Sequence, residues 1–435
     1  MSKNSVYRIG HGLLESVGSE FYGYWEHDKK PFIIADHNTW ALGGKAILQA
    51  FEQKVDYFLF PDSEPVFADY SNVVTCRRYL QEDPSRIAIA LGSGTINDLV
   101  KLASYELEQS YMLIPTAPSV DGYTAVGSAL SVEGFKRTVY CPPPDVIIAD
   151  LDILCNAPSP MIASGYGDLA AKVTGGADWL IADTLGIEPV VEKVWLMVQK
   201  NLRTYLNNPY SLAERDPQAI EFLFNGLVDS GYAIREYIDS RPASGAEHLM
   251  SHVWEMDHLA VNGEPVSHGF KVSIGTLSIT ALMQELLAMS KEDISRLISE
   301  HPLESWEKRQ SYIDAILEND PAKDEIKAIY QEKFCHGQQI IDNRSAIIRE
   351  WDCMKQRIQA QIIPFDELRE KFKAVGCPVE PKDIALTQNA HVKGFRKAQL
   401  IRKRYTCLDL VYEIGALDTI IHSVVHSGKY FNQYL

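Results

Sequence analysis

The sequence lacks several features that would place it at a membrane or outside the cell. No uninterrupted apolar run approaches the ~18 residues needed to cross a bilayer, and the start of the chain lacks the apolar core of a signal peptide. The 7 cysteines are scattered without C-x-x-C pairs, a pattern that suits buried reduced thiols better than disulfides or a zinc ribbon. We therefore expect a cytoplasmic protein with no membrane partner.

The sequence also lacks an excess of basic residues: its formal net charge is −16 at pH 7. Nucleic acids and anionic membranes are bound through basic surfaces, so we expect neither as a partner. A phosphorylated substrate would require a local cluster of cations. The candidates on motif-bearing segments are Lys136, Arg137, Lys172 and Lys271.

The 435 residues suffice for two domains, and 46% of them are hydrophobic. In residues 31–150, short apolar runs alternate with helical spacing. This alternation is typical of an α/β domain with a parallel sheet covered by helices. The expected strands are 32–35, 57–60, 86–91, 111–114 and 145–150, and the expected helices are 40–52, 73–81 and 96–103.

Residues 115–132 are polar and rich in small side chains, which predicts a long connection or hairpin that ends in a strand at 136–140. Beyond residue 155 the pattern is helical almost to the end of the chain. We predict a first domain over 1–155 and an all-α domain over 156–435. The expected helices are 161–182, 190–206, 217–238, 244–260, 268–287, 292–300, 304–317, 322–348, 350–360, 365–374 and 395–427.

The most informative stretch of the first domain is Gly92-Ser-Gly-Thr-Ile-Asn-Asp-Leu-Val-Lys101. It predicts a strand, a tight turn and a helix, so backbone N–H groups and the positive end of the helix dipole would face an anion in the turn. It is neither G-x-G-x-x-G, because Asn97 takes the sixth position, nor a P-loop. A turn that binds nothing remains an equal alternative. Asp36, after an earlier strand, suits either a ribose hydroxyl or a helix N-cap.

The helical half holds a carboxylate and three histidines on segments that metal chemistry would use. Asp168 opens one helical segment, His248 and His252 share a helical face at i and i+4, and His268 begins another helix. One carboxylate and two imidazoles suit Zn²⁺, Ni²⁺ or Fe²⁺. Taken singly, each histidine is more often an ordinary core or capping residue, so spacing alone leaves both readings open.

Five motifs, taken together and in order, resemble one known family. They are Gly92 to Lys101, Pro115-Thr-Ala-Pro-Ser-Val-Asp-Gly-Tyr123, Gly165-Tyr-Gly-Asp-Leu-Ala-Ala-Lys172, Ser244-Gly-Ala-Glu-His248 and His268-Gly-Phe-Lys271. They are similar to those of the bacterial glycerol-1-phosphate dehydrogenases, within the superfamily of iron-type alcohol dehydrogenases, glycerol dehydrogenases and dehydroquinate synthases. The resemblance covers roughly residues 32–277. It implies a Rossmann-like first domain, a helical second domain and an active site in the cleft between them.

The resemblance also implies roles for particular residues. Asp168, His248 and His268 would bind one divalent metal, and Lys172 stands where some relatives have a fourth, histidine ligand. Phe270 replaces the acidic residue that usually follows His-Gly. The dinucleotide, NAD(H) or NADP(H), would be bound by residues of the turn and of neighbouring strand ends: Asp36, Gly92, Ser93, Gly94, Thr95, Asp98, Thr116 and Ser119. Asp121 would face the substrate hydroxyls.

The function that the resemblance implies is the reversible reduction of dihydroxyacetone phosphate to sn-glycerol 1-phosphate. The metal would act as a Lewis acid, and His252 or a metal-bound water would supply the proton. Asp36 would repel a 2′-phosphate, which favours NADH over NADPH. The alternatives are a dehydrogenase of another polyol or sugar phosphate, a dehydroquinate-synthase-like cyclase, and a scaffold without chemistry. We also expect a homo-oligomer, a dimer or larger.

Overall fold

The computed structural model describes residues 5–62, 65–132 and 135–435. The chain divides into two compact units. Unit 1 comprises Met1–Gly165 and Thr204–Ile238, and unit 2 comprises Tyr166–Arg203 and Asp239–Leu435. The domain boundary predicted from the sequence, between residues 155 and 156, stays a prediction.

Unit 1 is built on a six-stranded sheet in the order β1-β8-β5-β4-β2-β3, with every neighbouring pair parallel. In register, Ile33 of β2 lies opposite Ile89 of β4, and Leu91 of β4 lies opposite Ile114 of β5. The predicted parallel sheet is therefore confirmed. The strands are β1 (Val6–Gly10), β2 (Lys30–Ala35), β3 (Asp56–Leu59), β4 (Arg86–Gly92), β5 (Met112–Pro115) and β8 (Val146–Asp150).

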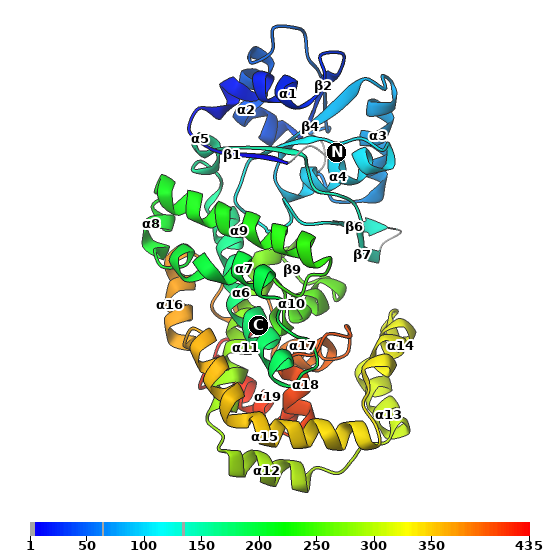
Figure 1. Ribbon diagram of the computed structural model, residues 1–435, viewed down its shortest axis with the longest axis vertical. Coiled ribbons are helices and arrows are strands. Elements are labelled where there is room, and N and C mark those ends of the chain that lie inside the picture. Colours follow the sequence, from blue (N-terminus) through cyan, green and yellow to red (C-terminus); the bar gives the residue numbers. More distant parts are fainter. Residues whose placement is uncertain (1–4, 63–64, 133–134) are drawn as a thin grey trace. The chain divides into compact units, whose positions relative to one another are not determined.

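Helices cover both faces of this sheet, as expected for strands that are apolar on both sides. Ile33, Ile89 and Ile148 belong to a buried cluster with residues of η1, α1 and α2, while Phe32 stacks on Tyr79 of α3. Figure 1 shows α2 and α3 on opposite sides of β4. The helices of unit 1 are η1 (Leu13–Ser16), α1 (Val17–Tyr24), α2 (His37–Gln49), α3 (Tyr70–Gln81), α4 (Gly94–Glu106), α5 (Leu151–Leu154), α8 (Pro209–Ala213) and α9 (Pro217–Tyr237).

The connection after β5 forms a loop and then an antiparallel hairpin of β6 (Ser128–Val132) and β7 (Phe135–Val139). The strand predicted at 136–140 is thus present, shifted by one residue. Strand β1, which pairs with β8 along the edge of the sheet, was not predicted from the sequence.

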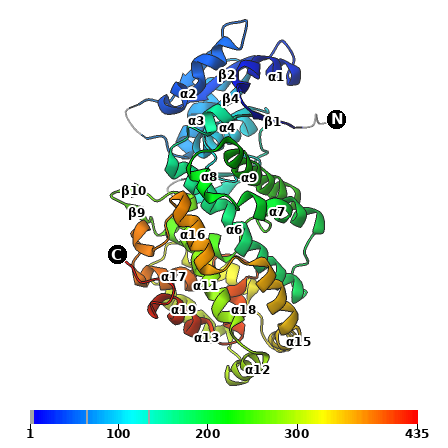
Figure 2. The ribbon, with the colours of Figure 1, turned by 90° about the vertical axis from the view of Figure 1, so that its left-hand side faces the viewer.

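Unit 2 is almost entirely helical. Its long helix α11 is buried along most of its length and contacts α10, α16 and α19 (Figure 2). The elements are α6 (Ser159–Thr184, which begins in unit 1), α7 (Glu192–Tyr205, which ends in unit 1), α10 (Ala246–Met256), β9 (Ala260–Val261), β10 (Glu264–Pro265), α11 (His268–Leu287), α12 (Lys291–Glu300), α13 (Trp306–Ile316), α14 (Lys323–Lys333), α15 (Gln338–Gln361), α16 (Phe365–Val375), η2 (Pro381–Ile384), α17 (Gln388–Ala398), α18 (Cys407–Glu413) and α19 (Leu417–His426).

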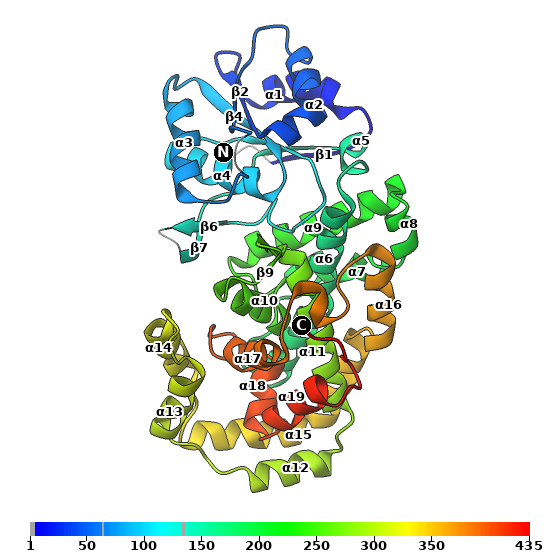
Figure 3. The same ribbon diagram turned by 180° about the vertical axis from the view of Figure 1, so that it is seen from behind.

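Three of the helices predicted in this half are wrong in extent. The helix predicted over 322–348 is divided between α14 and α15, and the separate helix predicted over 350–360 is the second part of α15. Gly337, at φ 57°, precedes α15. The helix predicted over 395–427 is divided among α17, α18 and α19, with Gly415 at φ 78° after α18. Glycine adopts positive φ without steric cost, so Gly415 ends α18 and Gly337 caps the start of α15 where apolar spacing continues. Figure 3 shows α13 and α14 side by side near one end of α15.

Within the described residues, no single helix is long and apolar enough to span a membrane. Only α11 and α12 taken together pass a test of length and composition, and the chain bends by 97° between them. The cytoplasmic location stays a prediction.

Candidate functional site

The turn between β4 and α4 is shaped by two glycines. A Cβ on Gly92 would lie 2.5 Å from Cβ of Ile96, so this position admits no side chain. A Cβ on Gly94 would lie 3.2 Å from Cγ2 of Val120. Ser93 precedes α4 in extended backbone and makes no side-chain capping bond. The first N–H groups of α4 are therefore left for an anion, which the helix dipole also favours.

The hydroxyl groups beside this turn form a small network. Ser93 Oγ lies 2.7 Å from Ser119 Oγ and 3.3 Å from the hydroxyl oxygen of Tyr123. Tyr123 is fully buried and donates to the carbonyl oxygen of Ala117. Burial raises the pKa of Tyr123, so its hydroxyl stays a donor. Ser93 is predicted to contact the pyrophosphate of the dinucleotide, and Ser119 its nicotinamide side. The two serines are thus neighbours, and both lie beside the buried hydroxyl of Tyr123.

Asp36 has the capping role that the sequence left open. Its Oδ1 accepts the N–H of Thr39 at 2.8 Å, and Thr39 Oγ1 accepts the N–H of Asp36 at 3.1 Å. This capping box begins α2 at the carboxyl end of β2. A carboxylate has a second oxygen, so the cap is compatible with a ribose contact, which stays a prediction.

The remaining predicted dinucleotide residues differ in their surroundings. Thr95 is partly exposed in the first turn of α4, and the N–H of Thr116 donates to Gly92 at the end of β4. Asp98 has partners in β6 and on its own helix: its Oδ2 accepts the N–H of Ala129 at 3.4 Å, and its Oδ1 lies 3.8 Å from Lys101 Nζ. A carboxylate repels pyrophosphate, so these contacts suit a structural role for Asp98. Its predicted role in cofactor binding stays untested.

The three predicted metal ligands come together in unit 2. Asp168 on α6, His248 on α10 and His268 at the start of α11 offer ligand atoms that all lie within 4.8 Å of one another. Asp168 is fully buried, and its Oδ1 lies 3.3 Å from Nε2 of His248. A Cβ on Gly167 would lie 2.6 Å from the carbonyl oxygen of Gly269, so a glycine at 167 lets α6 approach α11. This close approach brings the aspartate beside the histidines.

Each of the two predicted histidine ligands has its own carboxylate partner. Nδ1 of His248 lies 2.8 Å from Oε1 of Glu247, and Nδ1 of His268 lies 3.1 Å from Oε1 of Glu255. A ring that donates its Nδ1–H keeps a lone pair on Nε2, so both carboxylates favour the metal-binding tautomer. The donor set fits a divalent ion such as Zn²⁺, Ni²⁺ or Fe²⁺. Glu255 thereby gives His268 a carboxylate partner although Phe270 replaces the acidic residue that usually follows His-Gly.

Lys172 is part of the same buried cluster. It is fully buried, and its Nζ lies 2.6 Å from Oδ1 of Asp168. Burial opposes ionisation of Asp168, but Lys172 and His248 hold the pKa of this carboxyl below its usual range. Burial and Lys172 lower the pKa of His248, but Asp168 and Glu247 outweigh them and raise it to about 9. A metal must therefore displace a proton from His248 at neutral pH.

Glu255 also joins the cluster to two further groups. Its Oε2 lies 3.1 Å from Nδ1 of His252, and its Oε1 lies 3.4 Å from Nζ of Lys271. Burial opposes ionisation of Glu255, but His252 and His268 hold its pKa well below the usual range. The side chain of His252 is 36% exposed, so the predicted proton source is open to solvent. Lys271 also donates to the carbonyl oxygen of Val266 at 2.7 Å.

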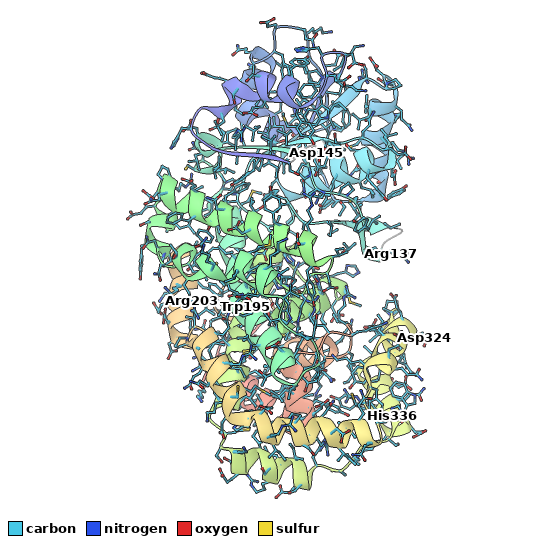
Figure 4. All side chains as sticks on the ribbon, in the orientation of Figure 1. Arg137, Asp145, Trp195, Arg203, Asp324 and His336 are labelled. Atoms are coloured by element: carbon cyan, nitrogen blue, oxygen red, sulfur yellow. The ribbon has the colours of Figure 1, made fainter. Side chains whose placement is uncertain are left out.

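The other predicted residues lie in unit 1. Asp121 is partly exposed in the loop that also carries Ser119. Arg137 is exposed on β7 (Figure 4), whereas the side chain of Lys136 lies outside the described residues.

Glu247 and Glu255 were not predicted from the sequence. Glu255 is three residues after His252 and seven after His248, so helical spacing placed it on their face and could have revealed it. No such signal exists for Glu247, which is adjacent to His248 in sequence. Its carboxylate is oriented by the N–H of Gly245 at 2.6 Å and the hydroxyl of Thr174 at 3.0 Å.

Comparisons with known proteins agree with the motifs. Residues 8–158 match the family described as iron-containing alcohol dehydrogenase. A glycerol-1-phosphate dehydrogenase (NAD(P)+) from Geobacillus thermodenitrificans is 32% identical over 321 residues, which cover 72% of this chain and 79% of the relative. The chain belongs to the glycerol-1-phosphate dehydrogenase family. A glycerol-1-phosphate dehydrogenase from Bacillus subtilis is also 32% identical, over 88% of this chain and 84% of its own length. The resemblance drawn from the motifs is confirmed.

Solved structures support the fold of this glycerol-1-phosphate dehydrogenase family member. A probable glycerol dehydrogenase from Sinorhizobium meliloti matches with a TM-score of 0.60 at 15% identity, covering 97% of this chain and 99% of its own. Glycerol dehydrogenase from Schizosaccharomyces pombe matches with a TM-score of 0.59 at 16% identity, covering 100% and 94%. The predicted fold class, an α/β part followed by a helical part, is confirmed. The active site in a cleft between the parts stays a prediction.

Proposed function

We propose that the protein reduces dihydroxyacetone phosphate to sn-glycerol 1-phosphate with NADH or NADPH, in a reversible reaction. The observation that carries the proposal is the convergence of Asp168, His248 and His268 in a chain whose relatives bear the name of this enzyme. The paired carboxylates at both histidines support a metal site rather than ordinary core histidines.

Asp168, His248 and His268 would hold one zinc, nickel or iron ion. Such an ion supplies a Lewis acid that polarises a ketone oxygen, and the nicotinamide supplies the hydride. The residues around the ion keep their own tasks. Glu247 and Glu255 orient the imidazoles, and Lys172 neutralises Asp168.

Three residues are proposed to act on the substrate. His252, exposed at its edge and fixed by Glu255 at Nδ1, would relay a proton from solvent to the new hydroxyl group through Nε2. Burial lowers the pKa of His252 to about 4, so the ring is neutral until it takes up that proton. Lys172 would add positive charge beside a phosphorylated substrate. Asp121 would accept hydrogen bonds from the substrate hydroxyls.

The dinucleotide would be bound in unit 1. The turn from Gly92 to Thr95 offers uncapped N–H groups for the pyrophosphate, and Thr116 and Ser119 lie beside it at neighbouring strand ends. The carboxylate of Asp36 at the end of β2 would favour the free ribose of NADH over the 2′-phosphate of NADPH.

The proposal is tested by the rate of NADH oxidation with a panel of ketones: dihydroxyacetone phosphate, dihydroxyacetone and larger sugar phosphates. We expect dihydroxyacetone phosphate to give the highest kcat/KM, and sn-glycerol 1-phosphate to be the product by chiral analysis. A higher kcat/KM with another ketone would favour a different polyol or sugar phosphate dehydrogenase. No NADH oxidation with any ketone would contradict the assigned reaction.

The source of phosphate selectivity is tested with Lys172→Met and Lys271→Met. If one of these ammonium groups anchors the phosphate, its loss should cost about 2–4 kcal/mol in kcat/KM for the phosphorylated ketone relative to the free ketone. The ratio between the two ketones is the readout, because both lysines also touch the metal cluster. Lys382→Met, at an exposed site, is the control. Equal losses on both ketones would exclude either lysine as the anchor.

A further inference from the structure

Lys101 is a buried lysine on the helix that follows the dinucleotide turn. It lies two turns after Gly94 on α4, and 1% of it is exposed. Its ammonium donates to the carbonyl oxygens of Gly122 at 2.8 Å, Ala125 at 3.2 Å and Gly127 at 3.1 Å. The three N–H donors of this lysine therefore have three acceptors, all within one loop.

Asp98, one helical turn earlier, holds the next part of the same loop. Its carboxylate accepts from Ala129 and lies 3.8 Å from the ammonium of Lys101. Its carbonyl oxygen accepts from the hydroxyl of Ser128 at 2.6 Å. One face of α4 thus contacts the loop through Lys101 and the start of β6 through Asp98, a Lys and an Asp at i+3 and i.

The opposite side of the loop is packed against α9. Thr124 donates through its hydroxyl to the carbonyl oxygen of Val228 at 2.7 Å. A Cβ on Gly231 would lie 2.1 Å from Oγ1 of Thr124 and 2.8 Å from the carbonyl oxygen of Asp121. The loop is therefore held between two helices of unit 1, with Ser119 and Asp121 at its start.

We propose that Lys101 is a positioning residue that holds loop 117–127 in the form that presents Ser119 and Asp121 to dinucleotide and substrate. The proposal rests on the proposed function, because it assigns those two residues to that reaction. Burying an ammonium is costly unless it is fully hydrogen-bonded, so a residue that only filled space would be apolar. Replacing Lys101 by an apolar side chain would leave three carbonyl oxygens without their donor.

The experiment compares Lys101→Met and Lys101→Gln with Ile47→Ala in the full-length protein. Gln is the second variant in case Met prevents folding, since its amide can still serve two carbonyl groups. Ile47 is a residue of α2 in the core cluster of unit 1, so Ile47→Ala lowers stability without removing a contact of loop 117–127. Hydrogen exchange of residues 117–129 without cofactor, the Kd for NADH, and kcat at saturating NADH are measured for each.

We expect loop amides to exchange at least tenfold faster in Lys101→Met than in Ile47→Ala, with a smaller increase in Lys101→Gln. The Kd for NADH should rise, and kcat should fall at least tenfold, while the bound metal stays at the wild-type amount. Unchanged loop exchange would overturn the proposal. So would faster exchange accompanied by losses in NADH binding and kcat no greater than those of Ile47→Ala.

Failure of the proposed function gives a different pattern. The wild-type protein would then not reduce dihydroxyacetone phosphate, whereas Lys101→Met would still loosen the loop and weaken NADH binding relative to Ile47→Ala. That result would retain Lys101 as a positioning residue for the dinucleotide and reject only the substrate.

Discussion

The dinucleotide turn of unit 1 and the metal cluster of unit 2 are built from different materials. The turn is made of backbone: glycines at 92 and 94 fix its shape, and helix N–H groups are its donors. The cluster is made of side chains from α6, α10 and α11, positioned by carboxylates that contact them. We therefore expect the turn to lose dinucleotide binding when a side chain is added to it. The cluster should lose metal binding when a side chain is removed.

The two regions also differ in charge. The turn is surrounded by hydroxyl groups, which need no counter-ion. The cluster holds three carboxylates, two lysines and three histidines in two neighbouring sets of ion pairs. Asp168 and Glu247 pair with Lys172 and His248, and Glu255 pairs with His252, His268 and Lys271. A divalent cation strongly changes the net charge of such a buried cluster. Loss of the metal should therefore destabilise unit 2 far more than unit 1.

The largest effect is expected for His268→Ala. Without this ligand the protein should lose its stoichiometric metal and at least ~1000-fold in kcat, about 4 kcal/mol, because the Lewis acid is gone. The Kd for NADH should stay within a few-fold of the wild-type value, since the turn belongs to the other unit. Metal analysis and NADH titration of the purified variant give both numbers.

His258→Ala is the matched control, because His258 is an exposed histidine just after α10. It should keep both metal and rate. Full metal content in His268→Ala would show that His268 is no ligand, and equal losses of metal and NADH binding would erase the distinction between the two regions.

A smaller effect is expected for Glu255→Gln. Glutamine has nearly the same shape, but it removes the negative charge that fixes the Nδ1–H of His268. Metal affinity should fall about 10- to 100-fold, the usual cost of losing such a partner. Competition with a chelator of known affinity measures this change without any assay of activity.

Glu264→Gln, at an exposed glutamate on β10, serves as the control and should bind metal normally. If Glu255→Gln retains wild-type metal affinity, the carboxylate that compensates for Phe270 has no influence on the ion, and the cluster depends on its three ligands alone.

The difference between the regions also explains what the sequence could predict. The turn is contiguous, so Gly92, Ser93 and Gly94 could be placed between a strand and a helix from their own stretch. The family motifs predicted the three side chains whose ligand atoms converge in unit 2, which apolar spacing alone could not. Strand β1 was missed because Arg8 interrupts its apolar residues and the strand is only partly buried at the edge of the sheet, and its pairing with β8 is a long-range contact.

Partners supplied by tertiary contacts were the hardest to predict. Asn97, at the sixth position of the turn motif, accepts through Oδ1 from the buried hydroxyl of Tyr111 at 2.8 Å, a partner fourteen residues further along the chain. Lys101 looked like the end of a motif, yet its acceptors come from more than twenty residues further along the chain. Nothing in local spacing encodes such pairings, because they depend on how the loop returns to the helix.

In the turn, the expected effect is that of an added side chain. Gly94→Val should raise the Kd for NADH at least tenfold, about 1.4 kcal/mol, because the new atoms lie where the pyrophosphate would approach the backbone. The metal content should not change. Gly23→Val, at a glycine of α1 whose Cβ would meet no atom within 4 Å, is the control for general helix destabilisation. Unchanged NADH binding by folded Gly94→Val would place the cofactor elsewhere.

The smallest effect is expected at Asp36, where backbone capping and ligand binding meet in one side chain. Asn caps a helix as well as Asp does, whereas Ala forfeits about 1 kcal/mol of stability. Asp36→Asn should therefore keep the wild-type Tm, and Asp36→Ala should lower it. If the carboxylate also contacts the ribose, both variants should shift the ratio of kcat/KM for NADH over NADPH toward NADPH, by less than tenfold. Asp69→Asn, at the N-cap of α3, is the control. An unchanged ratio in Asp36→Asn would leave Asp36 as a helix cap and assign coenzyme choice to other residues.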